Sequence, residues 1–383
     1  MSGFPRGRCA IVGAATHGLG ACPGFSALDL AAGASLKALA AAGLAPRNVD
    51  ALFVVLPDDA MSGLGLAEYL GMQTRLIDNN RLGGSSFLAH IHSAALALAA
   101  GECEIALIAY GSNQRSAAGK LIGSMRPPAY EAAYRMPRPI GAYAFAAGRY
   151  MHLYGAKREQ FGAVAIAARQ WATLNPEAFM REPLTMDEYL ASRMVADPLS
   201  VRDCCLVTDG AAAIVMVRAE RAPDLATTPV YVLAAAAAST HRDIAQMPEL
   251  TVTAAVESGA RAYAQAGVGP HDMDVLELYD AFTINTLLFL EDLGFCKKGE
   301  AADFVQGGRI APGGALPVNT NGGGLSCTHP GMYGLFTVVE SVRQLTGDAG
   351  ARQVANARLA LAHGNGGVFS SQVTVILGTA ETL

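Results

Sequence analysis

Short apolar runs alternate with longer segments of helical period along the first part of the chain. A continuous apolar run bounded by glycine or polar turn residues is typical of a buried strand, and apolar positions three and four residues apart are typical of a helix. The pattern therefore predicts β-α-β units packed in layers, and not an all-β domain. The expected strands are residues 9–14, 49–56, 75–79 and 105–110, and the expected helices are residues 29–42 and 87–100.

The second part of the chain repeats this plan. Its expected strands are residues 230–236, 275–279, 316–319, 359–362 and 373–377, and its expected helices are residues 250–266 and 335–345. A repeat of this length predicts two similar halves that share a central helix layer. We assign residues 1–225 to the N-terminal half and residues 226–383 to the C-terminal half.

A segment of different character, at about residues 112–198, separates the two halves. It is rich in proline and tyrosine, and its residues 148–172 have the pattern of one helix. A long insertion of this kind is commonly a lid or a binding loop. Its aromatic side chains are expected either to line a binding pocket or to form a small core beneath the loop.

Composition narrows the possible classes. With 383 residues, 51% of them hydrophobic, the chain can bury a large core. The net charge of −5 argues against a nucleic-acid surface, and no apolar run has the length of a membrane span. The first residues lead directly into a strand, without the pattern of a secretory signal. Seven cysteines without framework spacing suggest reduced thiols in a cytoplasmic protein, and the lack of a C-x-x-C pair argues against a zinc site.

Residues 319–334 read Asn-Thr-Asn-Gly-Gly-Gly-Leu-Ser-Cys-Thr-His-Pro-Gly-Met-Tyr-Gly. Three consecutive glycines permit positive φ and let backbone N–H groups approach a bound group closely. Pro330 suits the start of the helix expected at residues 335–345, and His329 then lies at a helix mouth where the dipole favours negative charge. The combination predicts a functional site more strongly than a simple connection.

This stretch resembles the thiolase motif N-x-x-G-G-x-x-x-x-G-H-P-x-G-x-x-G. Residues 278–283, Leu-Tyr-Asp-Ala-Phe-Thr, are similar to the H-D-C-F segment of the sterol-carrier-protein branch of thiolases. Residues 363–367, His-Gly-Asn-Gly-Gly, are similar to the C-x-G-G-G loop, with histidine in place of cysteine as in that branch. The resemblance covers essentially the whole chain. The positions in register with the first motif are Asn319, Gly322, Gly323, His329 and Pro330.

The resemblance implies the α/β thiolase fold, with layers in the order α-β-α-β-α and an inserted loop domain that shapes acyl and coenzyme A pockets. It also implies a homodimer that pairs through an edge strand and the helix near the nucleophile. Coenzyme A is expected as part of the substrate thioester, with no covalently bound cofactor. Asp280, Gly322, Gly323 and Gly366 are expected at the substrate.

One departure concerns the nucleophile. A thiolase carries a cysteine at the start of the buried helix, where the helix dipole lowers the thiol pKa. Residues 79–86 read Asn-Asn-Arg-Leu-Gly-Gly-Ser-Ser, and the missing cysteine falls near Gly83 or Gly84. A serine here, Ser85 or Ser86, is more often an N-cap than a nucleophile, so an acyl-enzyme is not expected. We expect Gly83, Gly84 and Ser85 to contact substrate instead.

The second departure is Tyr279, which stands where the branch has the histidine of H-D-C-F. A phenol with a pKa near ~10 is a poor base but a competent proton carrier and donor to an oxyanion. Tyr333 follows His329 by four residues, about one helical turn, so both are expected on one face. Tyrosine and histidine without a thiol suit retro-aldol cleavage, whose enolate is the species that a Claisen enzyme stabilises.

This combination resembles the lipid-transfer-protein group of thiolase-like aldolases, which cleave steroid side chains bound to coenzyme A. It implies that Tyr279 and Tyr333 carry the acid/base work while His329 and His363 orient the thioester or relay protons. The expected products are a ketone or aldehyde and a short acyl-CoA such as propionyl-CoA or acetyl-CoA. The resemblance also implies a small partner with a zinc ribbon and an OB-fold.

Two other functions stay open. One is a β-ketoacyl-CoA thiolase or acyltransferase with an atypical nucleophile, for which Cys327 is the candidate thiol because it lies inside the motif. The other is a non-catalytic subunit that binds acyl-CoA.

Overall fold

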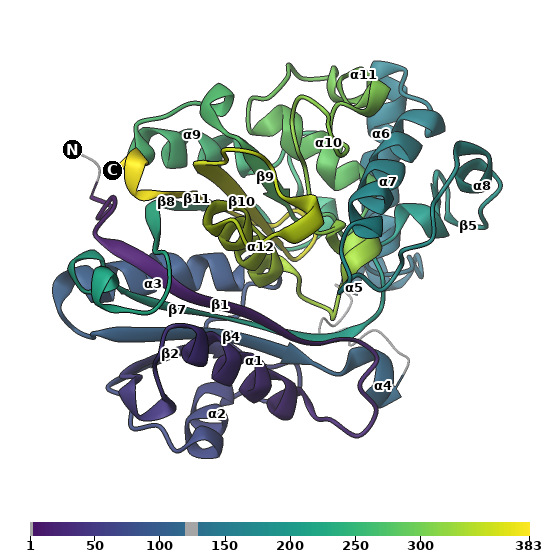
Figure 1. The fold of residues 1–383 in the computed structure, drawn as a ribbon. Helices are drawn as coiled ribbons and strands as arrows, with labels where there is room; N and C mark the ends of the chain where they lie inside the picture. Colours follow the sequence, from purple (N-terminus) through teal and green to yellow (C-terminus); the bar gives the residue numbers. More distant parts are fainter. Residues whose placement is uncertain (1–2, 119–128) are drawn as a thin grey trace.

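The computed structural model describes residues 3–118 and 129–383, which form a mixed α/β fold around a sheet. The strands are ordered β3-β2-β4-β7-β1-β8-β11-β10-β9 (Figure 1). β1 and β8 pair at only two positions, Ala10 with Tyr231 and Ile11 with Val230, so this join divides the sheet into two parts. The bounds are β1 Cys9–Gly20, β2 Ala51–Val55, β3 Leu76–Asp78, β4 Ile105–Ser112, β7 Asp209–Arg218, β8 Val230–Ser239, β9 Val275–Leu278, β10 Leu359–Gly366 and β11 Ser371–Gly378.

The two parts of the sheet lie on opposite sides of α3 (Ser86–Ala100) and α12 (Gly334–Thr346), as Figure 1 shows. The outer face of the first part is covered by α1 (Ala27–Ala41) and α2 (Ser62–Leu70). The outer side of the second part carries α9 (Ala255–Ala266) and α10 (Thr283–Asp292), followed by the short α11 (Ala301–Phe304). These are the expected layers α-β-α-β-α, and the predicted fold class is confirmed.

The central helices are apolar around most of their circumference because sheets cover them on two sides. Phe87, Leu88, Ile91 and Leu98 of α3 are fully buried. The strands of both sheet parts are near-continuous apolar runs for the same reason. α3 and α12 therefore share one core, and both begin beside the glycine-rich segments that the sequence singles out.

The inserted segment forms a helical layer at one end of the molecule (Figure 1). Residues 119–128 of this segment lie outside the described residues. The predicted single helix at residues 148–172 is wrong, because Gly155 adopts a left-handed conformation that ends one helix before the next begins. The elements here are α4 Gln114–Ala118, α5 Ala129–Ala132, α6 Ile140–Tyr154, α7 Arg158–Thr173, α8 Met186–Leu190, β5 Met194–Ala196 and β6 Leu199–Ser200.

Two other expectations fail locally. Residues 316–319 were expected as a strand, but they form only a bridge from Val318 to Leu276 of β9, because Pro317 has no N–H and Asn319 turns to positive φ. The helix expected at residues 250–266 begins at Ala255, whose N–H donates to the side chain of Thr253. Both expected elements are thus shorter than predicted, because backbone groups at their ends make hydrogen bonds outside the helix or strand.

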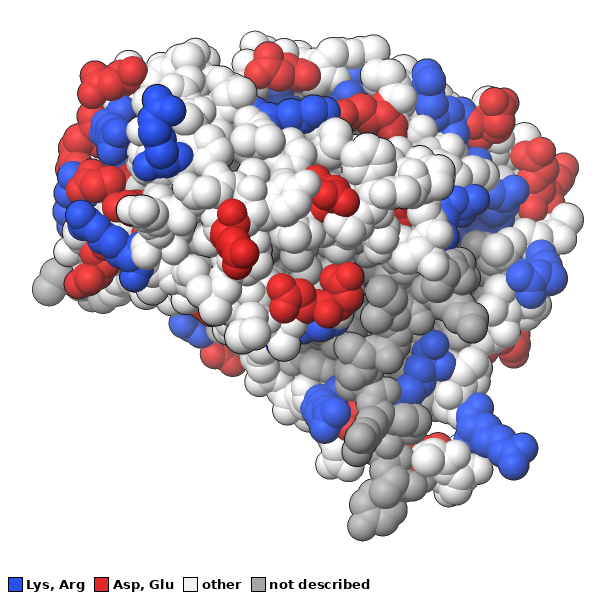
Figure 2. Space-filling model, turned by 90° about the horizontal axis from the view of Figure 1, so that it is seen from below, with Lys and Arg blue, Asp and Glu red and all other residues white. Residues whose placement is uncertain are grey.

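Among residues 3–118 and 129–383, no helix combines the length and the apolar character needed to cross a membrane. On the face seen from below, charged side chains of both signs are scattered among broad uncharged areas (Figure 2).

Candidate active site

Tyr279 and His329 meet at the carboxyl end of β9. Tyr279 directly follows that strand, and its hydroxyl lies 3.1 Å from Nε2 of His329. The backbone N–H of Tyr333 donates to the Tyr279 oxygen at 3.2 Å. Because the phenol oxygen already accepts this bond, its own proton is available to His329 or to a substrate. Nδ1 of His329 is buried and has no hydrogen-bond partner among the described residues.

Tyr333, the residue just before α12, completes a cluster with Tyr279 and His329. Its ring is 5.8 Å from that of Tyr279 and stacks at 6.2 Å on the imidazole of His329. Its hydroxyl donates to Oδ1 of Asn321 at 2.9 Å. The sequence pattern thus predicted the proximity of Tyr333 and His329 correctly, although a cap and not a helix face brings them together. Asn321 was missed, although it lies inside the motif.

The cluster is electrically neutral near pH 7. Burial raises the pKa of the Tyr279 and Tyr333 hydroxyls well above the usual value. Burial lowers the pKa of His329 to about 4, so its imidazole is uncharged. Burial raises the pKa of the neighbouring Asp280 carboxyl to about 7, although Gly324 N–H donates to it at 2.5 Å. A proton can therefore move among Tyr279, Tyr333 and His329 without a permanent charge on them, while Asp280 beside them changes its ionisation near pH 7.

The turn at residues 319–327 wraps around the Asp280 carboxyl. Gly322 and Gly323 have φ of 102° and 64°, and Gly323 opens a π-helical turn, Gly323–Cys327. A Cβ at Gly323 would overlap the Asp280 carboxylate, so only glycine fits against it here. The expected substrate residues Asp280, Gly322 and Gly323 thus lie together beside the Tyr279–His329 pair.

The loop that would carry a thiolase nucleophile has no room for a side chain. A Cβ at Gly84 would lie 2.5 Å from Cζ of Tyr279 and closer still to Cε2. A Cβ at Gly83, whose φ is 74°, would lie 2.8 Å from the backbone nitrogen of Gly367. The two positions considered for the missing cysteine are therefore closed by the Tyr279 ring and by the neighbouring loop.

Ser85 and Gly366 lie where the loop at residues 82–85 packs against the end of β10. Ser85 is buried, and its hydroxyl donates to Leu82 C=O and to Ser371 Oγ, both at 3.1 Å. It makes no cap hydrogen bond to α3; the neighbouring Ser86 hydroxyl bonds the loop instead. A Cβ at Gly366 would lie 2.4 Å or less from this loop, at Ser85 Oγ and Leu82 O, so the two backbones meet closely.

His363 lies apart from the tyrosine cluster. Its Nε2 is 2.8 Å from Oε1 of Gln372 and its Nδ1 is 3.0 Å from Oγ1 of Thr374. Only its backbone reaches the site, where its C=O accepts from Tyr279 N–H at 3.0 Å. Burial lowers the pKa of His363 to about 4. Its side chain packs against Phe289 of α10, so it can act on the site only through β10 or through other residues.

Cys327 is buried, and burial raises its thiol pKa far above the usual value. Its sulfur lies 3.5 Å from Nδ2 of Asn175, which suits a packed thiol and not a reactive thiolate. Among the described residues, no group of three or more His, Cys, Asp or Glu side chains is arranged to hold a metal ion.

A cavity of about 310 Å³ lies beside the glycine-rich turn. Its wall includes Leu325 and Ser326 of that turn, and Cys205, whose N–H donates to Ala281 C=O. The buried guanidinium of Arg169 also lines it and donates to Ser326 Oγ at 3.0 Å and to Glu182 C=O at 2.8 Å. A larger hollow of about 450 Å³ lies beyond Met180 and touches none of the tyrosine cluster.

Comparison with known proteins agrees with this architecture. Residues 236–379 match the family model described as "Thiolase C-terminal domain-like". The chain is 37% identical over 365 residues to a 17-hydroxy-3-oxo-4-pregnene-20-carboxyl-CoA lyase of Mycobacterium tuberculosis, covering 89% of this chain and 92% of the lyase. It is 36% identical over 369 residues to a steroid side-chain-cleaving aldolase of Thermomonospora curvata, covering 91% and 92%.

Among solved structures, the "Ltp2-ChsH2(DUF35) aldolase" matches with a TM-score of 0.88 and 35% identity, covering 98% of each chain. The chain therefore belongs to the thiolase superfamily, in the branch that includes the steroid side-chain-cleaving aldolases.

Proposed function

We propose that this protein is a retro-aldolase that cleaves a β-hydroxyacyl-CoA. The favoured substrate is the CoA thioester of a steroid side chain. The products are a ketone or aldehyde and a short acyl-CoA such as propionyl-CoA or acetyl-CoA. The observation that carries the proposal is the Tyr279 hydroxyl, held between His329 Nε2 and Tyr333 N–H where a thiol would have no room. Two relatives whose names describe steroid cleavage support the substrate class.

The proton path follows from these contacts. The substrate β-hydroxyl gives its proton to the Tyr279 oxygen as the Tyr279 proton passes to His329 Nε2. The β-oxygen becomes a carbonyl, the Cα–Cβ bond breaks, and its electrons form the enolate of the departing acyl-CoA. The proton returns along the same path to the α-carbon, so the step needs no further reactant. The Tyr333 hydroxyl, which donates its single proton to Asn321 Oδ1 in this structure, turns it to the developing oxyanion during the step.

The glycine loops are proposed to hold the thioester. Gly322, Gly323 and Gly366 contribute by close packing, since Ala172, Asp280 and Leu82 fill the places of their missing Cβ atoms. The N–H groups of Gly322 and Gly323 already donate to Asn319 C=O and Asn321 Oδ1. Gly83, Gly84 and Ser85 close the opposite side. The cavity beside Leu325 would take the pantetheine arm, with the Arg169 cation facing an anionic group of coenzyme A. His363 then acts through Gln372 as a positioning residue.

We also propose a cytoplasmic homodimer that works with a small zinc-ribbon/OB-fold protein and has no covalent cofactor. The structural neighbour named with a DUF35 component supports such a partner. The two halves at residues 1–225 and 226–383, with the loop domain at about 112–198, are proposed as its duplicated units.

The test is a cleavage assay with a β-hydroxyacyl-CoA that carries a tertiary alcohol, without free coenzyme A, in the presence and absence of the partner. We expect a ketone and a short acyl-CoA. Tyr279→Phe should lower kcat by about 10²- to 10⁴-fold because it removes the proton carrier. Tyr263→Phe is the matched control, since the Tyr263 hydroxyl donates to Leu293 C=O, away from the cluster.

Cleavage that requires free coenzyme A and a β-ketoacyl substrate would instead identify a thiolase. Binding without turnover, with the partner present, would identify a non-catalytic subunit. Either result contradicts the retro-aldolase proposal.

A further inference from the structure

A segment of the inserted domain runs along the glycine-rich turn. Residues 175–180 follow α7, and three of them donate hydrogen bonds to that turn. Phe179 N–H donates to Cys327 C=O, and Met180 N–H donates to Ser326 C=O, both at 2.9 Å. Nδ2 of Asn175 donates to Asn321 C=O, also at 2.9 Å. We call residues 175–180 the strap.

The turn needs support of this kind. Asn319, a residue with a side chain, has φ of 53°, and Gly322 and Gly323 also lie at positive φ. Sparsely populated backbone conformations persist only when surrounding contacts hold them. The strap supplies contacts on one side of the turn, and Asp280 supplies contacts on the other.

Asn321 joins the strap to the candidate catalytic cluster. Its Oδ1 accepts the N–H of Gly323 at 2.7 Å and the hydroxyl of Tyr333 at 2.9 Å. Its own C=O is fixed by Asn175. A shift of the Asn321 backbone therefore moves the acceptor of the Tyr333 hydroxyl.

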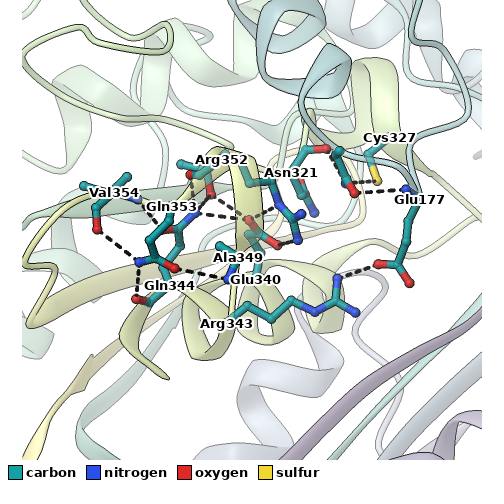
Figure 3. Close-up of polar contacts among 12 residues, drawn as sticks. Glu177, Asn321, Cys327, Glu340, Arg343, Gln344, Ala349, Arg352, Gln353 and Val354 are labelled. Carbon is teal, nitrogen blue, oxygen red and sulfur yellow. Dashed lines mark hydrogen bonds and ion pairs between the residues drawn. The ribbon is translucent and has the colours of Figure 1, made fainter. Parts of the chain in front are cut away.

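Asn175 is itself fixed in place. It is fully buried, and its Oδ1 accepts the backbone N–H of Glu177 at 3.0 Å. The Glu177 carboxylate pairs with Arg343 of α12 at 2.6 Å (Figure 3) and accepts from Thr16 of β1 at 2.9 Å. The strap is thus tied to the helix that begins one residue after Tyr333.

We propose that Asn175 is a positioning residue for the Tyr333 hydroxyl, acting through Asn321. The proposal rests on the retro-aldolase function proposed above. Asn175 does not line the cavity of about 310 Å³, so it should affect turnover and leave substrate binding nearly unchanged.

The test uses Asn175→Asp, which keeps the shape and the acceptor for Glu177 N–H and has no donor to Asn321 C=O when ionised, beside Asn175→Ala, which has no donor at any pH. We expect kcat to fall by about 10- to 100-fold, since small displacements of reacting groups cost that much, with KM changed less than about twofold. Gln170→Glu makes the same amide-to-carboxylate change at an exposed position of α7 and should leave both constants unchanged. Asn175→Ala, which buries no charge, serves if Asn175→Asp does not fold.

A double-mutant cycle with Tyr333→Phe separates positioning from general stability. If Asn175 acts through the Tyr333 hydroxyl, Asn175→Asp should change kcat little in the Tyr333→Phe background. Additive losses, or wild-type kcat in Asn175→Ala, would overturn the proposal.

A wild-type protein without retro-aldol activity would contradict the proposed function, and the effect of Asn175 on the position of the Tyr333 hydroxyl is then tested without kinetics. A crystal structure of Asn175→Asp then decides: separation of the Tyr333 hydroxyl from Asn321 Oδ1 supports it, and an unchanged hydrogen bond overturns it.

Discussion

The glycine at position 84 and the tyrosine at position 279 depend on each other sterically. The sequence shows them as separate departures, one a missing cysteine and the other a tyrosine in place of histidine. In the structure the Tyr279 ring fills the space that a side chain at position 84 would occupy. The Tyr279 hydroxyl can reach His329 because the loop that carries the nucleophile in thiolases has glycine at positions 83 and 84 in this chain.

Gly84→Ala should therefore damage the site from outside the reacting atoms. The new methyl group overlaps the Tyr279 ring, which must move away from His329 Nε2 and Tyr333 N–H. We expect kcat to fall by about 100-fold, since misplacement of a reacting group by about 1 Å costs this much.

Gly148→Ala is the matched control for this substitution. Gly148 lies within α6, and a Cβ there meets no atom of the described residues within 4 Å, so alanine should stabilise the helix by about 0.5–1 kcal/mol and leave kcat unchanged. Wild-type activity in Gly84→Ala would show that the ring position does not matter.

The motif register predicted which residues meet, but not how. Tyr279 and His329 lie in matched segments, and the structure brings them into contact across 50 residues. His363 also lies in a matched segment, yet alternation along β10 turns its side chain toward α10. Asn175 could not be found from the sequence, because a hydrogen bond across 146 residues leaves no local pattern.

Beneath the site, β9 and α12 are joined by a buried polar cluster. Arg352 holds both carboxylate oxygens of Glu340, at 2.8 and 2.9 Å (Figure 3). Thr320 bridges Glu340 and Glu277 through its hydroxyl, at 2.9 and 2.7 Å. Burial, followed by the charge of Glu340, raises the pKa of Glu277 well above its usual value. One glutamate is thus paired with a cation, and the other is held protonated.

The two glutamates should respond differently to the same substitution. Glu340→Gln leaves the buried Arg352 cation without its partner, which we expect to cost about 3–5 kcal/mol in the free energy of unfolding. Glu277→Gln replaces a protonated acid by an amide of the same shape, and should cost less than about 1 kcal/mol at pH 5. Urea unfolding of both variants measures the difference.

The raised pKa of Glu277 determines how its contribution to folding stability changes with pH. Because its pKa is raised in the fold, the folded protein keeps a proton that the unfolded chain releases above about pH 4.3. This contribution to stability is complete below that pH and decreases as the pH rises. Glu277→Gln should therefore gain stability relative to wild type from pH 5 to pH 8. Parallel curves would contradict a protonated Glu277.

At the scale of the whole molecule, repeated apolar patterns predicted the layers correctly, since short apolar runs bounded by turn residues indicate buried strands and longer apolar segments indicate helices. The inserted domain was harder to predict. Gly155 ends α6, but a glycine within a helical pattern does not by itself mark an end. The narrow join between β1 and β8 depends on contacts between the halves and has no sequence signal.

The open edge of the sheet supports the proposed homodimer. β3 is an outermost strand and pairs only with β2 among the described strands. Leu82, in the loop after β3, and Leu96 on α3 are 38% and 40% exposed. Exposed strand edges and apolar patches commonly mark contacts between chains.

A charged side chain at this edge of the sheet, beside β3 and α3, should separate the subunits. If α3 lies in the dimer contact, Leu96→Lys buries an unpaired ammonium there, and light scattering should give one chain of 39.6 kDa where the wild type gives two. Val256→Lys is the matched control, because Val256 is 48% exposed and lies on α9, which covers the outer side of the other part of the sheet. A wild-type monomer, or a Leu96→Lys dimer as stable as the control, would contradict pairing through α3. The candidate active site is built within one chain, so a monomeric variant should retain the Tyr279–His329 contact and turn over substrate.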